Sequence, residues 1–396
     1  MGLAGREIVV VGAGIGGLAA AIALARRGAR ARVVEQAPAL TEVGAGLQLG
    51  PNAVAVLAAL GLDEMLAPLA SVPAAIELRD FRRGDLVARL PLGAAAVARY
   101  RRPYWQFHRA DLLGALAGAA AAAGVEIETG ARVLGIEQDG AGARVLAERT
   151  AFAAEVVIAA DGARSGLRAA LFGGRPARFT GNVAWRGLVP AGRLPPGTAP
   201  EATCVTMGPG RHLVTYPLRR GTLVNFVAVE ERTDWAAEGW SATDDPDRLR
   251  AAYRGWHPGV EALLAAVSET FLWGLHDHAP IPDWSRGCVA LLGDACHPMT
   301  PFLAQGAAMA IEDAWVLAAC LDGAETMEAG LRDYSRRRLP RASRTQAAAA
   351  RNGRLYHLGA PARGAAHLGL RLASRLAPGA LLGRFDWLYG EDVTRG

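Results

Sequence analysis

Residues 7–35 read EIVVVGAGIGGLAAAIALARRGARARVVE, and this stretch predicts a strand, a glycine turn, a helix and a second strand. The opening run is continuously apolar after its first residue, as is typical of a strand buried on both faces of a parallel sheet. The helix is expected from Leu18 to Arg27, and Gly28 ends it. This order of elements predicts an α/β domain built on a parallel sheet.

Three glycines of the turn, Gly12, Gly14 and Gly17, have the spacing GxGxxG. Gly12 makes the tight turn, Gly14 lets the backbone approach a pyrophosphate, and Gly17 lets the helix pack closely on the strand. The free N–H groups at the helix N-terminus would hold the pyrophosphate charge. A purely structural glycine turn is the alternative, and the accompanying strand, helix and strand argue against it.

Glu35 ends the second strand, 23 residues after Gly12, where a carboxylate can accept both hydroxyls of a ribose. A carboxylate at this position would repel a 2′-phosphate, so the expected ligand resembles ADP-ribose and is not NADP. The motif alone does not separate FAD from NAD.

Composition excludes several classes of protein. The chain has 396 residues, which favours two or three domains, and its hydrophobic fraction of 51% argues against wholesale disorder. All 43 basic residues are arginine, and the net charge is +5. This mild excess suits anionic small molecules, and no basic stretch is interleaved with aromatic residues, so no nucleic-acid partner is expected.

Cysteine, histidine and apolar patterns give further expectations. Four cysteines without a CxxC pair predict neither a disulfide scaffold nor a zinc ribbon. The run His276-Asp277-His278 suits a strand edge, and no metal site is expected.

No signal peptide or apolar run of membrane-spanning length is found, so no membrane partner and a cytoplasmic location are expected. The arginines between residues 336 and 344 are interpreted as a solvated helix face or as an attractor of an anionic cofactor.

Two later stretches end strands on an aspartate. EVVIAADGARSGLR, residues 155–168, predicts a buried strand that leads to Asp161, and CVALLGDACHPMTPFLAQGAAMAIEDA, residues 288–314, predicts a strand that leads to Asp294. Open α/β sheets place their ligands at the carboxyl ends of strands. The alternatives are a turn with a capping aspartate for the first and an ordinary strand–helix connection for the second.

A helix N-terminus and an arginine are expected to supply positive charge near these aspartates. Gly306 is expected to open an alanine-rich helix, whose positive end suits a group that becomes anionic, and Pro298 and Pro301 stiffen the preceding loop. Arg109 is expected just before another helix, where it would bind phosphate or lie in solvent.

Together these stretches resemble the class A FAD-dependent aromatic hydroxylases, which have the para-hydroxybenzoate hydroxylase-like fold. The resemblance is nearest to the branch of salicylate, 3-hydroxybenzoate and 6-hydroxynicotinate monooxygenases. The stretch that resembles this branch is GAGLQLGPNA at residues 44–53. The matching features are GAGIGG with Glu35, His108-Arg109, Asp161-Gly162 with Ser165 and Arg168, and Gly293-Asp294 with Pro301.

The resemblance implies roles around FAD. Glu35 would bind the adenosine ribose, Arg109 the pyrophosphate side, and Asp294 the ribityl or pyrophosphate region. Asp161 would serve FAD and the passing nicotinamide cofactor, NADH or NADPH, which would bind transiently because a second GxGxxG is absent. The isoalloxazine would be lined by Pro301, Gly306, Ala307 and Ala308.

The expected fold class is α/β, with a Rossmann-like FAD-binding domain, an inserted and mostly antiparallel substrate sheet, and a C-terminal helical segment. Short strand-like runs separated by Gly/Pro turns fill residues 181–279, and residues 76–98 look like a hairpin of the same sheet. The predicted domains are therefore 1–75, 99–180 and 280–396 for FAD, and 76–98 with 181–279 for the substrate.

Five residues are candidates for contact with the substrate. Period-two alternation places His212 and Tyr216 on one face of a strand, where Tyr216 could hydrogen-bond a phenol and His212 could assist its deprotonation; both could instead be core residues. Arg186 could pair with a carboxylate or be a surface arginine. The resemblance puts Gln48 at a substrate position where the branch can have histidine. Phe302 belongs to an apolar lining with Leu47, Leu49 and Met309, all of which could be plain core.

The expected reaction uses O2 and NAD(P)H to hydroxylate a small phenolic or hydroxypyridine ring, carrying a carboxylate, through a flavin C4a-hydroperoxide in a cavity that excludes water. One alternative is an FAD-dependent epoxidase or hydroxylase of a larger natural product. Another is an NAD-binding regulator without turnover. A homodimer is possible.

Overall fold

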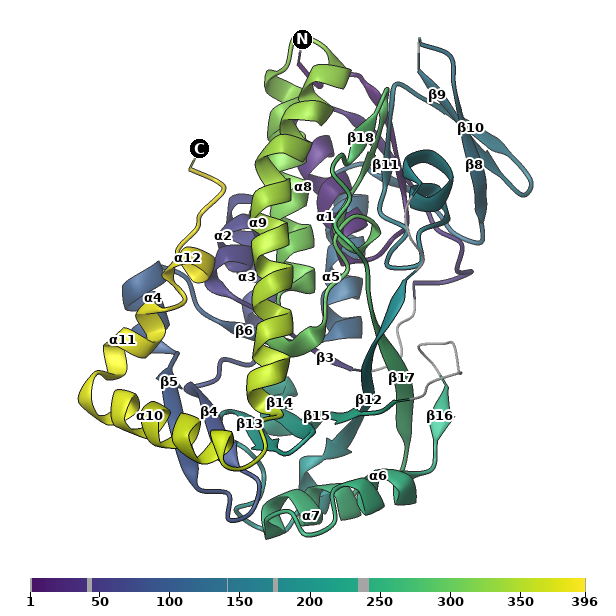
Figure 1. The fold of residues 1–396 in the computed structure, drawn as a ribbon. Coiled ribbons are helices and arrows are strands. Elements are labelled where there is room, and N and C mark those ends of the chain that lie inside the picture. The colour runs from purple at the N-terminus through teal and green to yellow at the C-terminus, as the bar shows by residue number, and fades with distance from the viewer. Residues whose placement is uncertain (1, 41–44, 141, 174–176, 234–241, 396) are drawn as a thin grey trace.

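A computed structural model describes residues 2–40, 45–140, 142–173, 177–233 and 242–395. Gly44, which opens the GAGLQLGPNA motif, lies outside them. The chain builds two large sheets, one at each end of a pair of long helices, α8 (Gly306–Gly323) and α9 (Met327–Tyr356), which run side by side (Figure 1).

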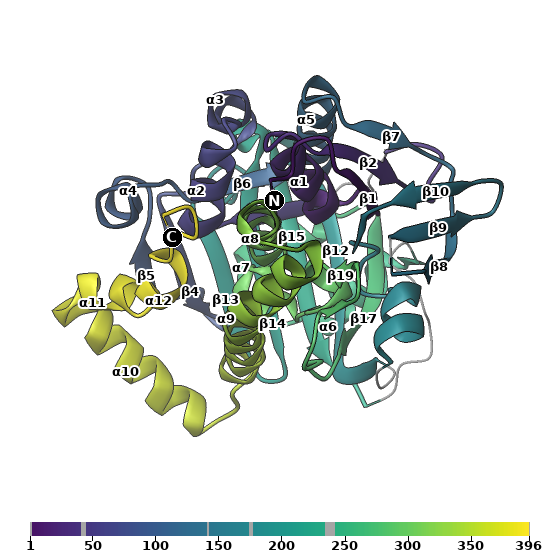
Figure 2. The ribbon, with the colours of Figure 1, turned by 90° about the horizontal axis from the view of Figure 1, so that it is seen from above.

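The first sheet has six strands in the order β18-β19-β11-β1-β2-β7, and every pair but the β18–β19 edge is parallel. The central strand β1 (Glu7–Val11) is the apolar run that opens the chain, and its valines are almost completely buried. Helix α1 (Ile15–Ala25) follows it and packs against α8, as the view from above shows (Figure 2). The other strands are β2 (Arg30–Val34), β7 (Glu126–Glu128), β11 (Val156–Ala159), β18 (Ser285–Arg286) and β19 (Val289–Leu291).

The second sheet has eight strands in the order β16-β17-β12-β15-β14-β13-β4-β5, and only β13 and β4 pair in parallel. Its strands come from two separate parts of the chain, because β4 and β5 form a hairpin that precedes the rest. Together the two sheets and the C-terminal helices confirm the predicted fold class. The bounds are β4 (Ala75–Asp80), β5 (Leu86–Pro91), β12 (Arg178–Pro190), β13 (Thr203–Gly208), β14 (Arg211–Leu218), β15 (Leu223–Glu231), β16 (Thr243–Asp244) and β17 (Thr270–Asp277).

Smaller sheets and short helices accompany the two large sheets. A two-stranded ladder of β3 (Gly46–Leu49) and β6 (Trp105–His108) lies between them and contacts β14. A separate three-stranded sheet flanks the parallel sheet; its strands are β8 (Val133–Gln138), β9 (Ala143–Ala147) and β10 (Ala151–Ala154). The remaining helices before α8 are α2 (Pro51–Ala59), α3 (Asp63–Leu66), α4 (Ala94–Tyr100), α5 (Arg109–Ala122), α6 (Pro246–Ala252) and α7 (Pro258–Ala265).

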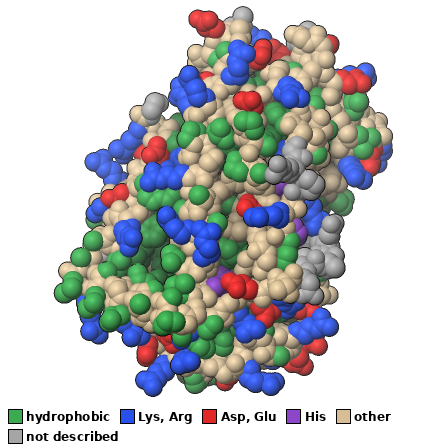
Figure 3. Space-filling view, viewed as in Figure 1, with side chains coloured by type: hydrophobic (Ala, Val, Ile, Leu, Met, Phe, Trp, Pro, Cys, Tyr) green, Lys and Arg blue, Asp and Glu red, His purple; other side chains and the backbone are tan. Residues whose placement is uncertain are grey.

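The C-terminal helices return toward the hairpin of the second sheet. Helix α10 (Ala362–Leu376) lies against β5 and projects with α11 (Pro378–Gly383) from the side of the molecule, before α12 (Asp386–Tyr389) (Figure 2). One face of α10 exposes leucines at four-residue intervals, Leu368, Leu372 and Leu376. Apolar side chains gather over this region of the surface (Figure 3). Of the helices described, none combines the length and apolar character that crossing a membrane requires.

Candidate functional site

The glycine turn between β1 and α1 is packed so tightly that two of its glycines have no room for a side chain. Gly12 has a positive φ of 104°, and a Cβ there would lie 2.4 Å from the carbonyl oxygen of Ala160. A Cβ on Gly17 would lie 2.0 Å from the carbonyl oxygen of Gly12. Gly14 differs, because a Cβ there would meet no protein atom within 4 Å. The backbone at Gly14 is therefore open on the side where the helix N-terminus points its N–H groups.

Glu35 is held beside this turn by two backbone hydrogen bonds. Its carboxylate accepts from the N–H of Ala13 at 2.7 Å and from the N–H of Ala37 at 2.8 Å. Each carboxylate oxygen has a second lone pair, so Glu35 can still accept hydrogen bonds from the two hydroxyls of a ribose. These two hydrogen bonds hold the Glu35 carboxylate at the edge of the turn and leave it able to accept further hydrogen bonds.

Asp161 and Asp294 follow the neighbouring parallel strands β11 and β19, so both lie at the same edge of the sheet. Burial raises the pKa of both carboxyls. Asp294 nevertheless has an exposed side chain, and Arg109 is close enough to counter the rise in its pKa. The Asp294 carboxyl is therefore surrounded by protein atoms but remains accessible to a ligand. The charge of Arg109 therefore acts on Asp294, and charges of both signs near one strand end suit a polar, partly anionic ligand.

Helix α8 has its N-terminus beside Asp294. It begins at Gly306, close to Asp294, and its first turn carries no acidic residue and no side-chain cap from Gln305. Ala307 is partly buried and Ala308 is completely buried, so only small side chains follow Gly306, and Pro301, in the loop before the helix, is exposed. The N–H groups of this first turn are therefore available to a ligand that carries negative charge.

These features fit FAD. The open backbone at Gly14 would take the pyrophosphate, Glu35 the adenosine ribose, and Asp294 with Arg109 the central part of the molecule. The N-terminus of α8 would face the end of the isoalloxazine that gains negative charge on reduction.

The register of the second sheet places three predicted substrate residues on one face. Arg186, His212 and Tyr216 pair across the ladders with residues 227, 229 and 225 of β15, respectively. Directly paired residues share a face, and alternate residues along a strand do as well. Phe302 packs against this face, with its ring 5.2 Å from the ring of His212. The face is therefore turned toward the loop that leads into α8.

Tyr216 meets Gln48 on this face. Tyr216 is 2% exposed, and its burial raises its pKa, which a hydrogen bond with Gln48 partly counters. Tyr104, which the sequence analysis missed, donates a hydrogen bond to Gln48 Oε1 at 2.9 Å. Tyr104 directly precedes β6, the partner strand of β3, so its proximity to Gln48 depends on a pairing of distant segments. Leu49 and Met309 of the predicted lining are completely buried.

Arg186 is buried, so the interpretation of Arg186 as a surface arginine was wrong. It is 8% exposed, and its guanidinium lies 4.9 Å from the centre of the Trp273 ring. A buried cation on the same face as Tyr216 can recognise a carboxylate through a planar, bidentate contact.

The interpretation of the arginines at 336–344 as a solvated face was wrong for two of them. The side chain of Arg338 is 2% exposed and forms ion pairs with Glu312 and Asp313, each at 2.7 Å. Arg341 forms an ion pair with Glu312 at 2.7 Å. These charges face α8 because α9 packs along it. Local sequence could not show this, since the acidic partners lie on another helix.

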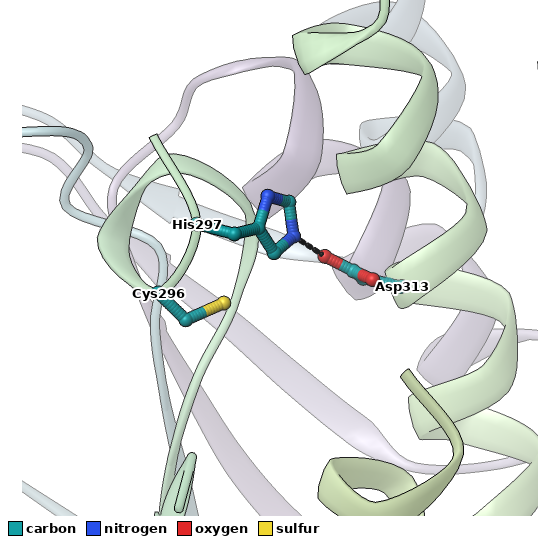
Figure 4. A group of neighbouring side chains, drawn as sticks. All are labelled: Cys296, His297 and Asp313. Carbon is teal, nitrogen blue, oxygen red and sulfur yellow. Dashed lines mark hydrogen bonds and ion pairs between the residues drawn. The ribbon is translucent and has the colours of Figure 1, made fainter. Parts of the chain in front are cut away.

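Cys296, His297 and Asp313 offer ligand atoms within 4.8 Å of one another (Figure 4). The two oxygens of Asp313 are taken by His297 Nε2 at 2.5 Å and by Arg338 Nε at 2.7 Å. Burial opposes a charge on His297, but Cys296 and Asp313 outweigh it and hold the pKa of His297 well above its usual value. The group therefore has the chemistry of a buried ion pair rather than of a metal site.

Comparison with known proteins identifies a family to which this chain is similar. The profile described as "FAD binding domain" matches residues 6–349. A 3-amino-4-hydroxybenzoate 2-monooxygenase of Streptomyces platensis is 40% identical over 391 residues, which cover 98% of this chain and 96% of the relative. A 6-hydroxynicotinate 3-monooxygenase of Bordetella bronchiseptica is 39% identical, with coverage of 86% and 89%.

The fold agrees with solved structures of the same kind. A Klebsiella pneumoniae HpxO variant complexed with FAD superposes with a TM-score of 0.85 at 30% identity, covering 97% of this chain and 99% of that one. A salicylate hydroxylase in complex with its substrate gives 0.82 at 26% identity, covering 99% and 97%.

Proposed function

This chain belongs to the FAD-binding family of flavoprotein aromatic hydroxylases, and on that premise we propose that it hydroxylates a small aromatic ring bearing a hydroxyl group and a carboxylate. The substrates named for its relatives, 3-amino-4-hydroxybenzoate and 6-hydroxynicotinate, have both groups. The observation that carries the proposal is the shared face of Arg186, His212 and Tyr216, turned toward Phe302 and the N-terminus of α8.

Bound FAD supplies the redox chemistry, accepting hydride from NAD(P)H and activating O2 for transfer of one oxygen atom. The protein's residues position the ring for that transfer. Arg186 would bind the carboxylate, Tyr216 with Gln48 would hydrogen-bond the ring hydroxyl, and Phe302 would exclude water. A proton acceptor at the ring hydroxyl favours hydroxylation because a phenolate is more electron-rich than a phenol.

The proposed function is tested with FAD-loaded protein and a panel of hydroxybenzoates and hydroxypyridine carboxylates. The expected result is one compound that accelerates NAD(P)H oxidation and is recovered with one additional oxygen atom. The same assay, run with NADH and with NADPH, identifies the reductant. If every compound is recovered unchanged while NAD(P)H oxidation stays at its basal rate, the proposed substrate class is wrong.

Arg186→Met is expected to raise KM for the best carboxylated substrate by about 10- to 100-fold with a smaller change in kcat. A charge-assisted hydrogen bond contributes about 1.5–3 kcal/mol, and each 1.4 kcal/mol is tenfold in affinity. Steady-state kinetics measure this change. Arg178→Met is the matched control, because Arg178 lies on the same strand but is exposed, and it should leave KM unaltered. Equal KM values for the two variants would remove Arg186 from the substrate site.

Tyr216→Phe is expected to lower kcat by about 100-fold, within the range for loss of a positioned group that assists proton transfer. The variant keeps the ring that packs against Gly46, so the fold and the flavin content should be retained. Product formation per NAD(P)H consumed is the second readout. An unchanged rate and yield would show that Tyr216 is only a core residue.

The remaining expectations stay predictions. We propose the division into an FAD domain (1–75, 99–180, 280–396) and a substrate domain (76–98, 181–279). We also propose a cytoplasmic location, where NAD(P)H is available, and a homodimer, whose mass light scattering would report.

A further inference from the structure

Three polar side chains form a line from the substrate face to the surface. His212 Nδ1 lies 2.7 Å from His357 Nε2, and His357 Nδ1 lies 2.8 Å from Glu231 Oε1. His212 is 1% exposed, whereas the side chain of Glu231 is 57% exposed. The line therefore connects a fully buried base with solvent through one intermediate imidazole.

The order of the hydrogen bonds fixes the protons. An ionised carboxylate only accepts, so the proton shared with Glu231 belongs to Nδ1 of His357. Nε2 of neutral His357 is then an acceptor, and the proton between the two rings belongs to Nδ1 of His212. The remaining nitrogen of neutral His212, Nε2, has a free lone pair. Glu231 thus sets His212 in the form that can take a proton from a neighbouring hydroxyl.

The backbone holds both ends of the line in place. His357 caps the C-terminus of α9, and Glu231 ends β15. Gly210 links them, because its N–H donates to the carbonyl of His357 at 3.1 Å and its carbonyl accepts from the N–H of Glu231 at 2.9 Å. The geometry of the line is therefore built into the junction between α9 and the second sheet.

The surroundings of His212 are otherwise mostly apolar. The rings of Phe302 and Tyr356 lie 5.2 Å from its ring, and its cross-strand neighbours are Met207 and Val229. At the outer end, Glu231 pairs with His357, and Glu230, which precedes it on the strand, pairs with Arg211 and Arg232. Burial lowers the pKa of both histidines, which disfavours a positive charge held on either ring.

We propose that His212, His357 and Glu231 form a proton relay that carries the proton of the substrate's ring hydroxyl to solvent. This inference rests on the proposed function and extends it to two residues far from the ring. The hydroxyl O–H bond breaks as a bond to His212 Nε2 forms, and the Nδ1 proton of His212 passes to His357 Nε2. The Nδ1 proton of His357 passes to Glu231, which releases it to water. The reverse sequence returns a proton to the product and restores the starting tautomers, and no atom changes oxidation state.

The test uses the FAD-loaded enzyme and the best substrate from the panel. Deprotonation of the bound ring is followed by stopped flow, through the difference between the ultraviolet spectra of the phenol and the phenolate. His357→Gln keeps a side chain that hydrogen-bonds but removes the transferable ring proton, and Glu231→Gln removes the final acceptor. Both variants are expected to slow deprotonation about tenfold or more while flavin content and substrate affinity stay within about twofold. Added imidazole should partly restore the rate of His357→Ala.

Glu269→Gln is the matched control, because Glu269 is an exposed carboxylate beside the same sheet and lies outside the relay. Wild-type deprotonation rates in both relay variants would overturn the proposal. Should His357→Gln fail to fold, Glu231→Gln decides alone, since its exposed side chain tolerates the change. The proposed function fails separately, when the wild-type enzyme itself hydroxylates no member of the panel.

Discussion

Gly14→Val is expected to reduce the affinity for FAD by on the order of 100-fold, or about 3 kcal/mol, while the apoprotein folds normally. The Cβ at Gly14 meets no protein atom within 4 Å, and the residue has an extended backbone that any amino acid adopts. The added side chain would instead occupy the space in front of the α1 N-terminus, where the pyrophosphate is expected. Titration of FAD into the apoprotein, followed by flavin fluorescence, measures the loss.

Two glycines serve as controls for this experiment. Gly118→Val lies in α5 at an exposed position with open space around it, so FAD affinity and stability should stay nearly unchanged. Gly17→Ala should damage folding and FAD binding together, because its Cβ would lie 2.0 Å from a backbone oxygen. If Gly14→Val binds FAD as tightly as Gly118→Val does, the pyrophosphate does not lie at this turn.

Glu312→Gln is expected to lower the free energy of unfolding by about 3–5 kcal/mol, the usual cost of breaking a buried ion pair on one side. Glu312 is completely buried and accepts hydrogen bonds from Arg338, Arg341 and Asn52. Without the charge of Glu312, Arg341 would lose the carboxylate that it pairs with, and Arg338 would be left with Asp313, which also pairs with His297. Urea unfolding measures the difference.

Glu328→Gln is the control with the same chemical change, because Glu328 is exposed and pairs only with Arg332 one helical turn away. Its effect should stay below about 0.5 kcal/mol. A similarly small effect of Glu312→Gln would show that the buried network contributes little to stability.

The same network predicts a pH dependence. Burial opposes ionisation of Glu312 and Asp313, but Arg338 and His297 outweigh it and hold both carboxyl pKa values below their usual range. A lowered folded-state pKa adds stability above the unfolded value, which is lost as the pH falls through the folded value. The wild-type protein should therefore lose stability below about pH 4 more steeply than Glu312→Gln does.

The nucleotide half was readable from the chain because its signals are contiguous. The strand, turn, helix and second strand lie within residues 7–35, and each is recognised by its own periodicity or by its glycines. The same holds for the alternation that put His212 and Tyr216 on one face of a strand, and for Gly306 as the start of a helix. These are local properties, set by backbone sterics and by which residues must be buried.

Only the tertiary structure joined the distant segments. His212 meets His357 across 145 residues of chain, and Arg338 meets Asp313 across 25, although neither partner is near the other in any local pattern. Whether a histidine or an arginine is a solvated residue, a core residue or a member of a network depends on its partner. That partner is chosen by the packing of α9 against α8 and of its C-terminus against the second sheet, which no short stretch of sequence specifies.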